Sequence, residues 1–405
     1  MSLEWNSYTI GESCNLITGF PFKSKYYLEN GAYNVVRGDN VKEGFIQWGD
    51  KKRCWDSLND KLKKVILKDK DIVIGMDGSK LGKNRATISK KDLPALLAQR
   101  VACVRAKEGF DQDYIKYVIL SNYFKAYVDK VKTGTSIPHI SLGQISEFTF
   151  EAPDYKKQKI ISAILSNIDK KISVNQEINK NLLQLSKVIF KNWFVEFEPF
   201  GGVQPNNWKI CTLEDVCDLK AGGDKPDVVS DEITDTCSYP IYSNGLDKDG
   251  LYGYTDQAKI FEESVTVSAR GTIGFVCLRH IPYVPIVRLV SVIPKKEFIS
   301  AKYLYLFLDR LNIMGTGTTQ QQLTIPDFKK TEILVPTLDI IKSFTNYITP
   351  IFEKIWIQEE EIKKLQKLRD TLLPKLMSGE IDVSKINCDL KNFIKRFIKK
   401  FKSIF

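Results

Sequence analysis

The chain of 405 residues contains one sequence pattern twice. Residues 133–194 align with residues 316–377 at a constant offset of 183, without a gap. The repeat has the size of a domain rather than of a solenoid unit, so it indicates two copies of one fold. We therefore predict a tandem duplication in which both copies perform the same task. The aligned pairs include Thr133 with Thr316, Gly134 with Gly317, Ile145 with Phe328 and Pro153 with Pro336.

The two copies also begin alike. Residues 10–19 align with residues 213–222 at an offset of 203, so insertions separate the copies in their middles. Short β-branched runs bounded by glycine turns, such as 71–74 and 264–267, predict mixed α/β halves. We expect a globular domain at 1–152, a helix at 153–198, a second globular domain at 199–336, a second helix at 337–381 and a basic amphipathic tail at 382–405.

Each globular domain is followed by a segment with an apolar heptad pattern, and each seam needs an apolar partner. Antiparallel pairing of the two helices predicts a coiled coil with a pseudo-twofold axis, in a mixed α/β (α+β) fold class. Pro350 lies within the second seam and predicts a kink or a break. The seam positions are Ile161, Leu165, Ile168, Ile172, Asn175, Asn179, Leu182, Ser186, Ile189 and Trp193 in the first segment, and Ile341, Phe344, Ile348, Ile351, Ile355, Gln358, Ile362, Leu365, Arg369, Leu372 and Leu376 in the second.

Two polar residues fall near the midpoints of these seams. Asn175 and Gln358 are aligned with each other at the offset of 183. A lone polar core layer can fix the register of a coiled coil. The alternative is that both are solvated surface positions, and the sequence leaves the two interpretations open.

Composition excludes several classes of protein and favours none. The net charge of +11 suits a polyanionic partner, but the excess lies mainly in residues 1–150 and in the tail, so charge alone does not prove DNA binding. The start carries no signal-like pattern and no run reaches the roughly 20 apolar residues of a membrane span, which predicts a cytoplasmic protein. Eight scattered cysteines lack a C-x-x-C pair, and neither His139 nor His280 has a metal-ligand neighbour, so no metal is predicted.

Several motifs together resemble the specificity (S) subunit of type I restriction-modification enzymes, over nearly the whole chain. They are the closing segment Gly134-Thr135-Ser136-Ile137-Pro138-His139-Ile140-Ser141, Pro153 before the first helix, the inter-repeat run Trp193-Phe194-Val195-Glu196-Phe197-Glu198-Pro199, the run Pro205-Asn206-Asn207-Trp208-Lys209, and the ending Leu368-Arg369-Asp370-Thr371-Leu372-Leu373-Pro374-Lys375-Leu376-Met377-Ser378-Gly379-Glu380-Ile381.

The resemblance implies a non-catalytic subunit that binds double-stranded DNA. Its two target-recognition domains would each read one half of a bipartite asymmetric site, and the two helices would set the spacer between the halves. The expected partners are methyltransferase (M) subunits and restriction motor-nuclease (R) subunits. S-adenosylmethionine, ATP and Mg are expected on those partners, and this chain is expected to hold no cofactor.

The sequence contains no amino-methyltransferase or nucleotide fingerprint and no convincing nuclease cluster. The alternative class is a structural coiled-coil scaffold whose end domains bind protein.

Base recognition requires forked or paired donors, and phosphate contacts require cations. The loop 77–85 resembles a phosphate loop, but Gly78 and Gly82 are one residue too close and Asn84 replaces the required hydroxyl. It and the loop 269–274 are predicted to be turns that could present Lys80 and Arg270 to DNA. The candidate DNA contacts are Lys23, Lys25, Arg37, Asn40, Lys80, Lys83, Asn84 and Arg85 in the first domain, and Lys225, Ser243, Asn244, Lys248, Arg270, Arg279, Gln320 and Gln321 in the second.

The basic tail has apolar residues on one helical face and lysines on the other. Such a pattern is compatible with a membrane surface, a partner helix or DNA phosphates. Because no other segment is membranous, we expect no membrane contact and favour packing on the helices or on a partner subunit.

Overall fold

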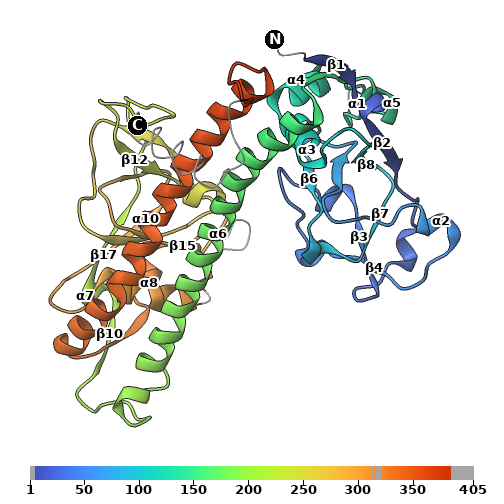
Figure 1. Cartoon of the computed structure of the whole chain (residues 1–405). Helices are drawn as coiled ribbons and strands as arrows, with labels where there is room; N and C mark the ends of the chain where they lie inside the picture. The colour runs from blue at the N-terminus through green and yellow to red at the C-terminus, as the bar shows by residue number, and fades with distance from the viewer. Residues whose placement is uncertain (1–4, 135, 312, 315–321, 385–405) are drawn as a thin grey trace. The chain divides into compact units, whose positions relative to one another are not determined.

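The structure, a computed structural model, describes residues 5–134, 136–311, 313–314 and 322–384. The chain divides into two compact units. Unit 1 comprises residues 1–174 and 362–405, and unit 2 comprises residues 175–361. Each unit therefore contains one globular domain together with parts of both long helices (Figure 1).

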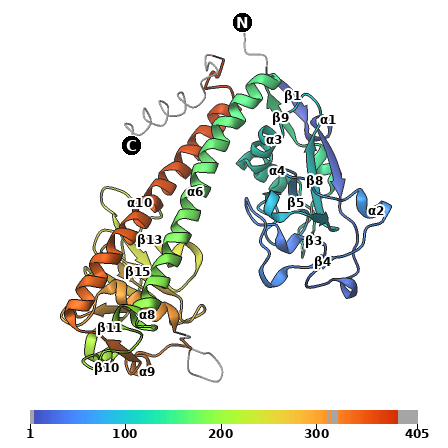
Figure 2. The same ribbon diagram turned by 60° about the horizontal axis from the view of Figure 1, so that its bottom comes forward.

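The domain of unit 1 is built on a four-stranded antiparallel sheet with the strand order β2-β8-β5-β6. A three-stranded sheet, β4-β3-β7, and a two-stranded sheet, β1-β9, complete it. Figure 2 shows β1 and β9 side by side near the start of α6. The elements are β1 (Asn6–Thr9), α1 (Ile10–Ser13), β2 (Cys14–Thr18), β3 (Tyr33–Val36), β4 (Cys54–Trp55), α2 (Asp60–Lys63), β5 (Ile72–Gly75), β6 (Arg85–Thr87), β7 (Ala95–Leu97), β8 (Val101–Ala106), α3 (Gln112–Leu120), α4 (Asn122–Val131), α5 (Leu142–Ser146), β9 (Thr149–Ala152) and α6 (Tyr155–Phe194), with short 3₁₀ turns between them.

Unit 2 repeats this plan. Its four-stranded sheet has the order β11-β17-β14-β15, its three-stranded sheet the order β13-β12-β16, and β10 pairs with β18. The outer elements recur at the two offsets found in the sequence, since β1 and β10 are 203 residues apart and α6 and α10 are 183 apart. The elements are β10 (Lys209–Thr212), α7 (Leu213–Val216), β11 (Cys217–Ala221), β12 (Tyr239–Tyr242), β13 (Leu251–Thr255), β14 (Ser264–Val267), β15 (Val276–Arg279), β16 (Val284–Pro285), β17 (Val290–Pro294), α8 (Ala301–Arg310), α9 (Ile325–Phe328), β18 (Glu332–Val335) and α10 (Leu338–Met377).

The helices α6 and α10 each have 40 residues, or about 60 Å at roughly 1.5 Å per residue. In unit 2, Asn175 Nδ2 donates to Glu361 Oε2 at 2.9 Å and Asn179 Nδ2 to the Ile355 carbonyl at 3.2 Å. From Asn175 to Asn179 the residue numbers in α6 rise, whereas those of their partners in α10 fall from 361 to 355, so the two helices pair antiparallel. The predicted fold class, two mixed α/β domains with an antiparallel coiled coil, is confirmed.

The break that was one of the two outcomes expected at Pro350 does not occur, because α10 continues from Leu338 to Met377. A proline removes one backbone donor from the helix ladder. The seam residue Ile348 and the neighbouring Phe352 are 0% and 3% exposed and pack in the core of unit 2, so the helix is anchored on both sides of the proline. The neighbouring Thr349 hydroxyl also donates to the Thr345 carbonyl at 2.7 Å.

The predicted seams lie in the two main cores. In unit 1, Ile161, Leu165 and Ile168 of α6 pack with Leu365 and Leu372 of α10 beneath the β2-β8-β5-β6 sheet. In unit 2, the inter-repeat run forms an aromatic cluster, because the rings of Phe194 and Phe344 lie 4.8 Å apart and those of Phe194 and Trp208 lie 5.7 Å apart. This run therefore attaches the second domain to the helix pair. Burial of such rings contributes most of the stability of a core.

Asn175 and Gln358 are both buried, with 0% and 4% exposure, so the solvated interpretation does not hold. The side-chain carbonyl oxygens of both residues lack a hydrogen-bond partner among the described residues. An unpaired buried acceptor costs free energy. The layer therefore reduces stability, as expected of a polar layer that specifies register rather than strength. Its role in register stays a prediction.

Replacing both residues with leucine is expected to raise the free energy of unfolding by roughly 1–3 kcal/mol, because two unpaired oxygens leave the core and the one bond lost, from Asn175 Nδ2, frees a half-buried Glu361 carboxylate that water can solvate. Urea unfolding of the double variant Asn175→Leu/Gln358→Leu measures this change. Asn167→Leu, on the exposed side of α6, is the control and should stay within about 0.5 kcal/mol. A lower stability of the double variant than of the control would show that the layer is stabilising.

Candidate nucleic-acid interface

Four segments of the first domain meet at one surface. The loop between β5 and β6 donates from Met76 N to the Arg100 carbonyl at 2.8 Å and from Gly78 N to the Pro138 carbonyl at 3.0 Å. A Cβ placed on Gly38 would lie 3.6 Å from Asp77 Oδ1, so the turn after β3 adjoins the same loop. We call residues 37–40, 76–84, 99–100 and 136–139 the domain 1 loop face.

The second domain assembles the equivalent segments. Asn244 joins two of them, since its Oδ1 accepts from Ala269 N at 2.7 Å and its Nδ2 donates to the Val287 carbonyl at 2.6 Å. Arg270 donates to Gln322 Oε1 from Nε at 3.3 Å and from Nη2 at 3.2 Å. Gln322 aligns with His139 at the offset of 183. We call residues 243–245, 269–274, 287–288 and 322 the domain 2 loop face.

Many of the predicted contacts lie on exposed loops. Lys80 and Lys83 are exposed and Asn84 is half-buried on the domain 1 loop face, and Arg270 is exposed on the domain 2 loop face. The exposed Lys23 precedes the 3₁₀ turn Ser24–Tyr26 and the exposed Lys25 lies within it, and the exposed Lys225 and Lys248 lie in loops of the second domain. Ser243 and Asn244 are half-buried on the domain 2 loop face.

Three predicted contacts are buried, which removes them from the candidate set. Asn40 is 0% exposed, and its amide caps the turn after β3 by accepting from Arg37 N at 3.1 Å and donating to the Gln47 carbonyl at 3.0 Å. Arg85 is 2% exposed, and its Nη1 donates to the carbonyls of Ile119 and Ser121 at 2.6 and 2.9 Å. These side chains satisfy protein groups rather than facing solvent.

Arg279 is the third buried residue, with 6% exposure. Its guanidinium lies 3.6 Å from the centroid of the Tyr242 ring and donates from Nε to Thr266 Oγ1 at 2.9 Å.

Arg37 is half-buried, and its Nη2 donates to the Lys51 carbonyl at 3.0 Å. Gln320 and Gln321 lie outside the described residues.

The loop faces also contain two arginines that the sequence did not single out. Arg100 and Arg288 are exposed and have left-handed backbone φ angles of 71° and 60°. Neither lies beside a glycine or within a basic run, so local sequence gives no signal for them. Only the strand pairing reveals that they occupy equivalent turns.

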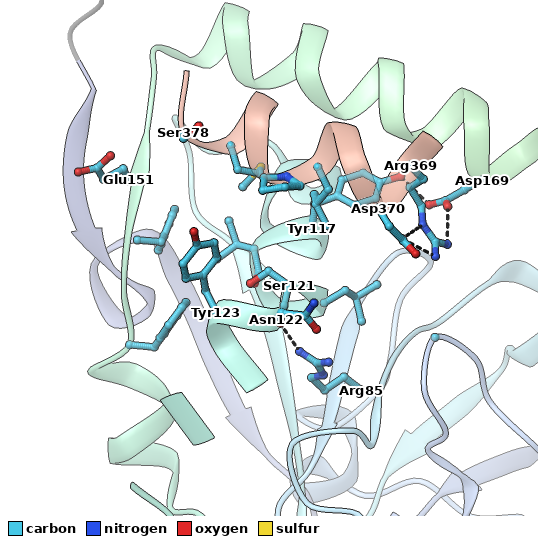
Figure 3. Close-up of a pocket in the computed structure, with 18 of the residues that line it drawn as sticks. Arg85, Tyr117, Ser121, Asn122, Tyr123, Glu151, Asp169, Arg369, Asp370 and Ser378 are labelled. Atoms are coloured by element: carbon cyan, nitrogen blue, oxygen red, sulfur yellow. Dashed lines mark hydrogen bonds and ion pairs between the residues drawn. The ribbon is translucent and has the colours of Figure 1, made fainter. Parts of the chain in front are cut away.

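A cavity of about 770 Å³ lies in unit 1 between α3, α4 and the last turns of α10, and the buried Arg85 is one of its lining residues (Figure 3). At one side of it, Asp169 of α6 accepts from Tyr117 Oη at 2.6 Å and pairs with Lys116 Nζ at 3.0 Å and Arg369 Nη1 at 3.3 Å. Burial opposes ionisation, but these cations and hydrogen bonds outweigh it and lower the pKa of Asp169. The network joins α3, α6 and α10, which positions the domain on the helix pair.

Two buried thiols, one in each domain, hold their protons firmly. Burial raises the pKa of Cys14 to about 11 and that of Cys217 to about 12, so both thiols are protonated at neutral pH. Across the ranges that the structure describes, no group of three or more His, Cys, Asp or Glu side chains is arranged to hold a metal ion. Within the same ranges, no helix has the length and apolar character needed to cross a membrane.

A duplicated α/β domain with a long helix after each copy, and with one loop face on each domain, defines a two-domain protein with two equivalent surfaces. The chain belongs to the family described as the type I restriction modification DNA specificity domain, whose model matches residues 2–184 and 205–370. The resemblance found in the sequence is thereby confirmed.

Two relatives illustrate the family. The chain is 24% identical over 312 residues to the type I restriction enzyme MjaIX specificity subunit of Methanocaldococcus jannaschii, covering 69% of this chain and 71% of that protein. It is 25% identical over 359 residues to the type I restriction enzyme HindI specificity subunit of Haemophilus influenzae, covering 66% and 77%. The fold is similar to the crystal structure of a type I restriction-modification S subunit from M. genitalium, with a TM-score of 0.61 at 16% identity over 93% of this chain and 96% of that one.

Proposed function

We propose that this chain is the DNA-reading subunit of a type I restriction-modification complex and recognises a bipartite asymmetric site. The observation that carries the proposal is the family match over both halves of the chain, each with one loop face. The two domains share their architecture but differ in the residues of their loop faces, so each domain reads a different half-site.

The antiparallel pair of α6 and α10 sets the spacer between the half-sites under this proposal. Each helix is about 60 Å long at roughly 1.5 Å per residue, compared with about 34 Å for one turn of B-DNA. The length is sufficient to hold two readers on half-sites about one turn apart. The proposed contacts that remain exposed or half-buried on the loop faces are Arg37, Lys80, Lys83, Asn84, Ser243, Asn244 and Arg270.

The chemistry belongs to partner subunits in this proposal. Methyltransferase subunits that use S-adenosylmethionine modify adenine, and motor-nuclease subunits that use ATP and Mg cleave DNA. This chain directs both and holds no cofactor. The names of the relatives as specificity subunits support a non-catalytic role.

Methylome sequencing tests the function. Cells that produce this chain with its methyltransferase subunit are expected to acquire methylated adenine at one bipartite motif, and cells that lack this chain are expected to lose that motif. The purified chain alone is expected to transfer no labelled methyl group from S-adenosylmethionine to DNA. Transfer by the isolated chain would contradict the non-catalytic role, and an unchanged methylome would contradict DNA reading and favour the scaffold alternative.

A further inference from the structure

A four-residue turn lies at the same place in the two domains, between β7 and β8 and between β16 and β17, although the second turn also holds Val287 at a positive φ of 52°. In the first domain Val101 N donates to the Ala98 carbonyl at 3.2 Å, and in the second Leu289 N donates to the Ile286 carbonyl at 3.1 Å. Each bond closes a four-residue β-turn, with Arg100 and Arg288 at its third position. The two arginines are therefore structural equivalents.

The surroundings of the two turns confirm the equivalence. Gln99 N donates to the Phe20 carbonyl at 2.8 Å, and Val287 N donates to the Gly223 carbonyl at 2.9 Å. Phe20 and Gly223 are themselves 203 residues apart, which is the offset of the matching beginnings of the domains. The following strands, β8 and β17, are the second strands in equivalent sheets.

The backbone at both positions favours glycine rather than arginine. The φ angles of 71° for Arg100 and 60° for Arg288 lie in the left-handed region, where a Cβ is strained. Such strain at a surface turn persists where the side chain serves a purpose. Strain alone does not single out the arginines, since Val287 beside Arg288 also has a left-handed φ of 52°. The feature that the two diverged domains share is an arginine at the third position of the equivalent turn, which suggests a purpose common to both domains.

Both guanidinium groups are available to a ligand. The Arg100 side chain is 63% exposed, and among the described residues its ion pair is with Asp77, at a long 3.9 Å from Nε to Oδ2. The Arg288 guanidinium has no hydrogen-bond or ion-pair partner within the part of the chain that the structure describes. The turn of Arg100 accepts a hydrogen bond from the β5–β6 loop, and that of Arg288 is joined to the β14–β15 loop through Asn244. Both arginines thus lie on the loop faces.

We propose that Arg100 and Arg288 each bind a backbone phosphate of the DNA and read no base. This inference rests on the proposed function and assigns a role within it. Domains that read different half-sites share only the sequence-independent part of recognition, which is contact with the phosphates. A cation held at the same position in both domains fits that shared part, whereas base-reading residues are expected to differ between them.

The test uses the full chain and random-sequence duplex DNA, with affinity measured over a series of salt concentrations. Arg100→Gly and Arg288→Gly remove the cation and suit the local backbone, so neither is expected to lower the melting temperature. Each should weaken binding roughly tenfold at low salt and reduce the slope of log K against log salt by about 0.9, the value for one lost phosphate contact. Arg288→Lys should retain most of the slope, because lysine also neutralises a phosphate.

Lys296→Ala is the matched control, since Lys296 is exposed beyond the opposite end of β17 and should leave the slope unchanged. If the wild-type chain binds DNA but neither glycine variant changes the slope of log K against log salt, the phosphate role is overturned and the proposed function is not. A changed methylation motif with Arg288→Lys would overturn it in favour of base reading, because a lysine cannot replace a bidentate arginine. Failure of the wild-type chain to bind any duplex would overturn both this inference and the proposed function.

Discussion

A chain in which residues 6–152 replace residues 209–335 is expected to direct methylation to a palindromic site. The replacement begins and ends at equivalent points, because β1 corresponds to β10 and β9 corresponds to β18. Two equivalent helices that pair antiparallel are related by a local twofold axis. Two identical readers attached to them would therefore present the same half-site in inverted orientation.

Methylome sequencing of cells that produce the duplicated chain with its methyltransferase subunit measures the outcome. The matched control is the reciprocal chain, with residues 209–335 in place of residues 6–152, which should give a different palindrome. Together the two palindromes should contain the two halves of the natural site. An unchanged asymmetric motif in either chain would show that the domains do not read independently.

The exchange could lower the stability of the chain, because the transplanted domain packs on a different helix surface. The seam residue Ile161 of α6 corresponds to Phe344 of α10, so a transplanted first domain meets a larger side chain. Overpacking of this kind costs typically 1–3 kcal/mol. A lowered melting temperature is therefore expected, and the motif is read only from a chain that still supports methylation.

Much of this fold could be predicted from the sequence because the repeat constrains it. The offset of 183 places the bounds of α6 and α10 in agreement, and the heptads identify residues such as Leu165 and Ile348 that are fully buried. Of the kink or break expected at Pro350, the break does not occur, because local propensity takes no account of tertiary packing. The buried seam on both sides of the proline outweighs the loss of one helix hydrogen bond.

The loop faces could be predicted only in part. Residue type indicates that Arg85 and Arg279 can donate to DNA, but it does not show that Arg85 satisfies carbonyls at the end of α3 or that Arg279 stacks on Tyr242. Those partners lie 34 and 37 residues away in the sequence. Arg100 and Arg288 were missed for the related reason that their equivalence depends on strand pairing rather than on a motif.

Inserting four residues after Asn181 and four after Lys354 is expected to lengthen the spacer of the recognised site. The two points lie nearly opposite each other, since Asn179 bonds to the Ile355 carbonyl. Inserting in both helices keeps them paired, whereas an insertion in α6 alone would leave its seam without a partner. Coiled coils tolerate four-residue insertions by local unwinding. Each helix gains about 6 Å at roughly 1.5 Å per residue, which corresponds to one or two base pairs at about 3.4 Å per pair.

The control inserts two residues at each of the same points. Two residues rotate the following helix by about 200°, which turns each seam away from its partner, so the control should lose methylation. Methylome sequencing of the four-residue variant should find the same half-site bases with a longer spacer. An unchanged spacer would refute the role of the helices as a ruler. Altered half-site bases would instead show that the helices also determine the conformation of the loop faces, since insertions at these points touch no residue of either face.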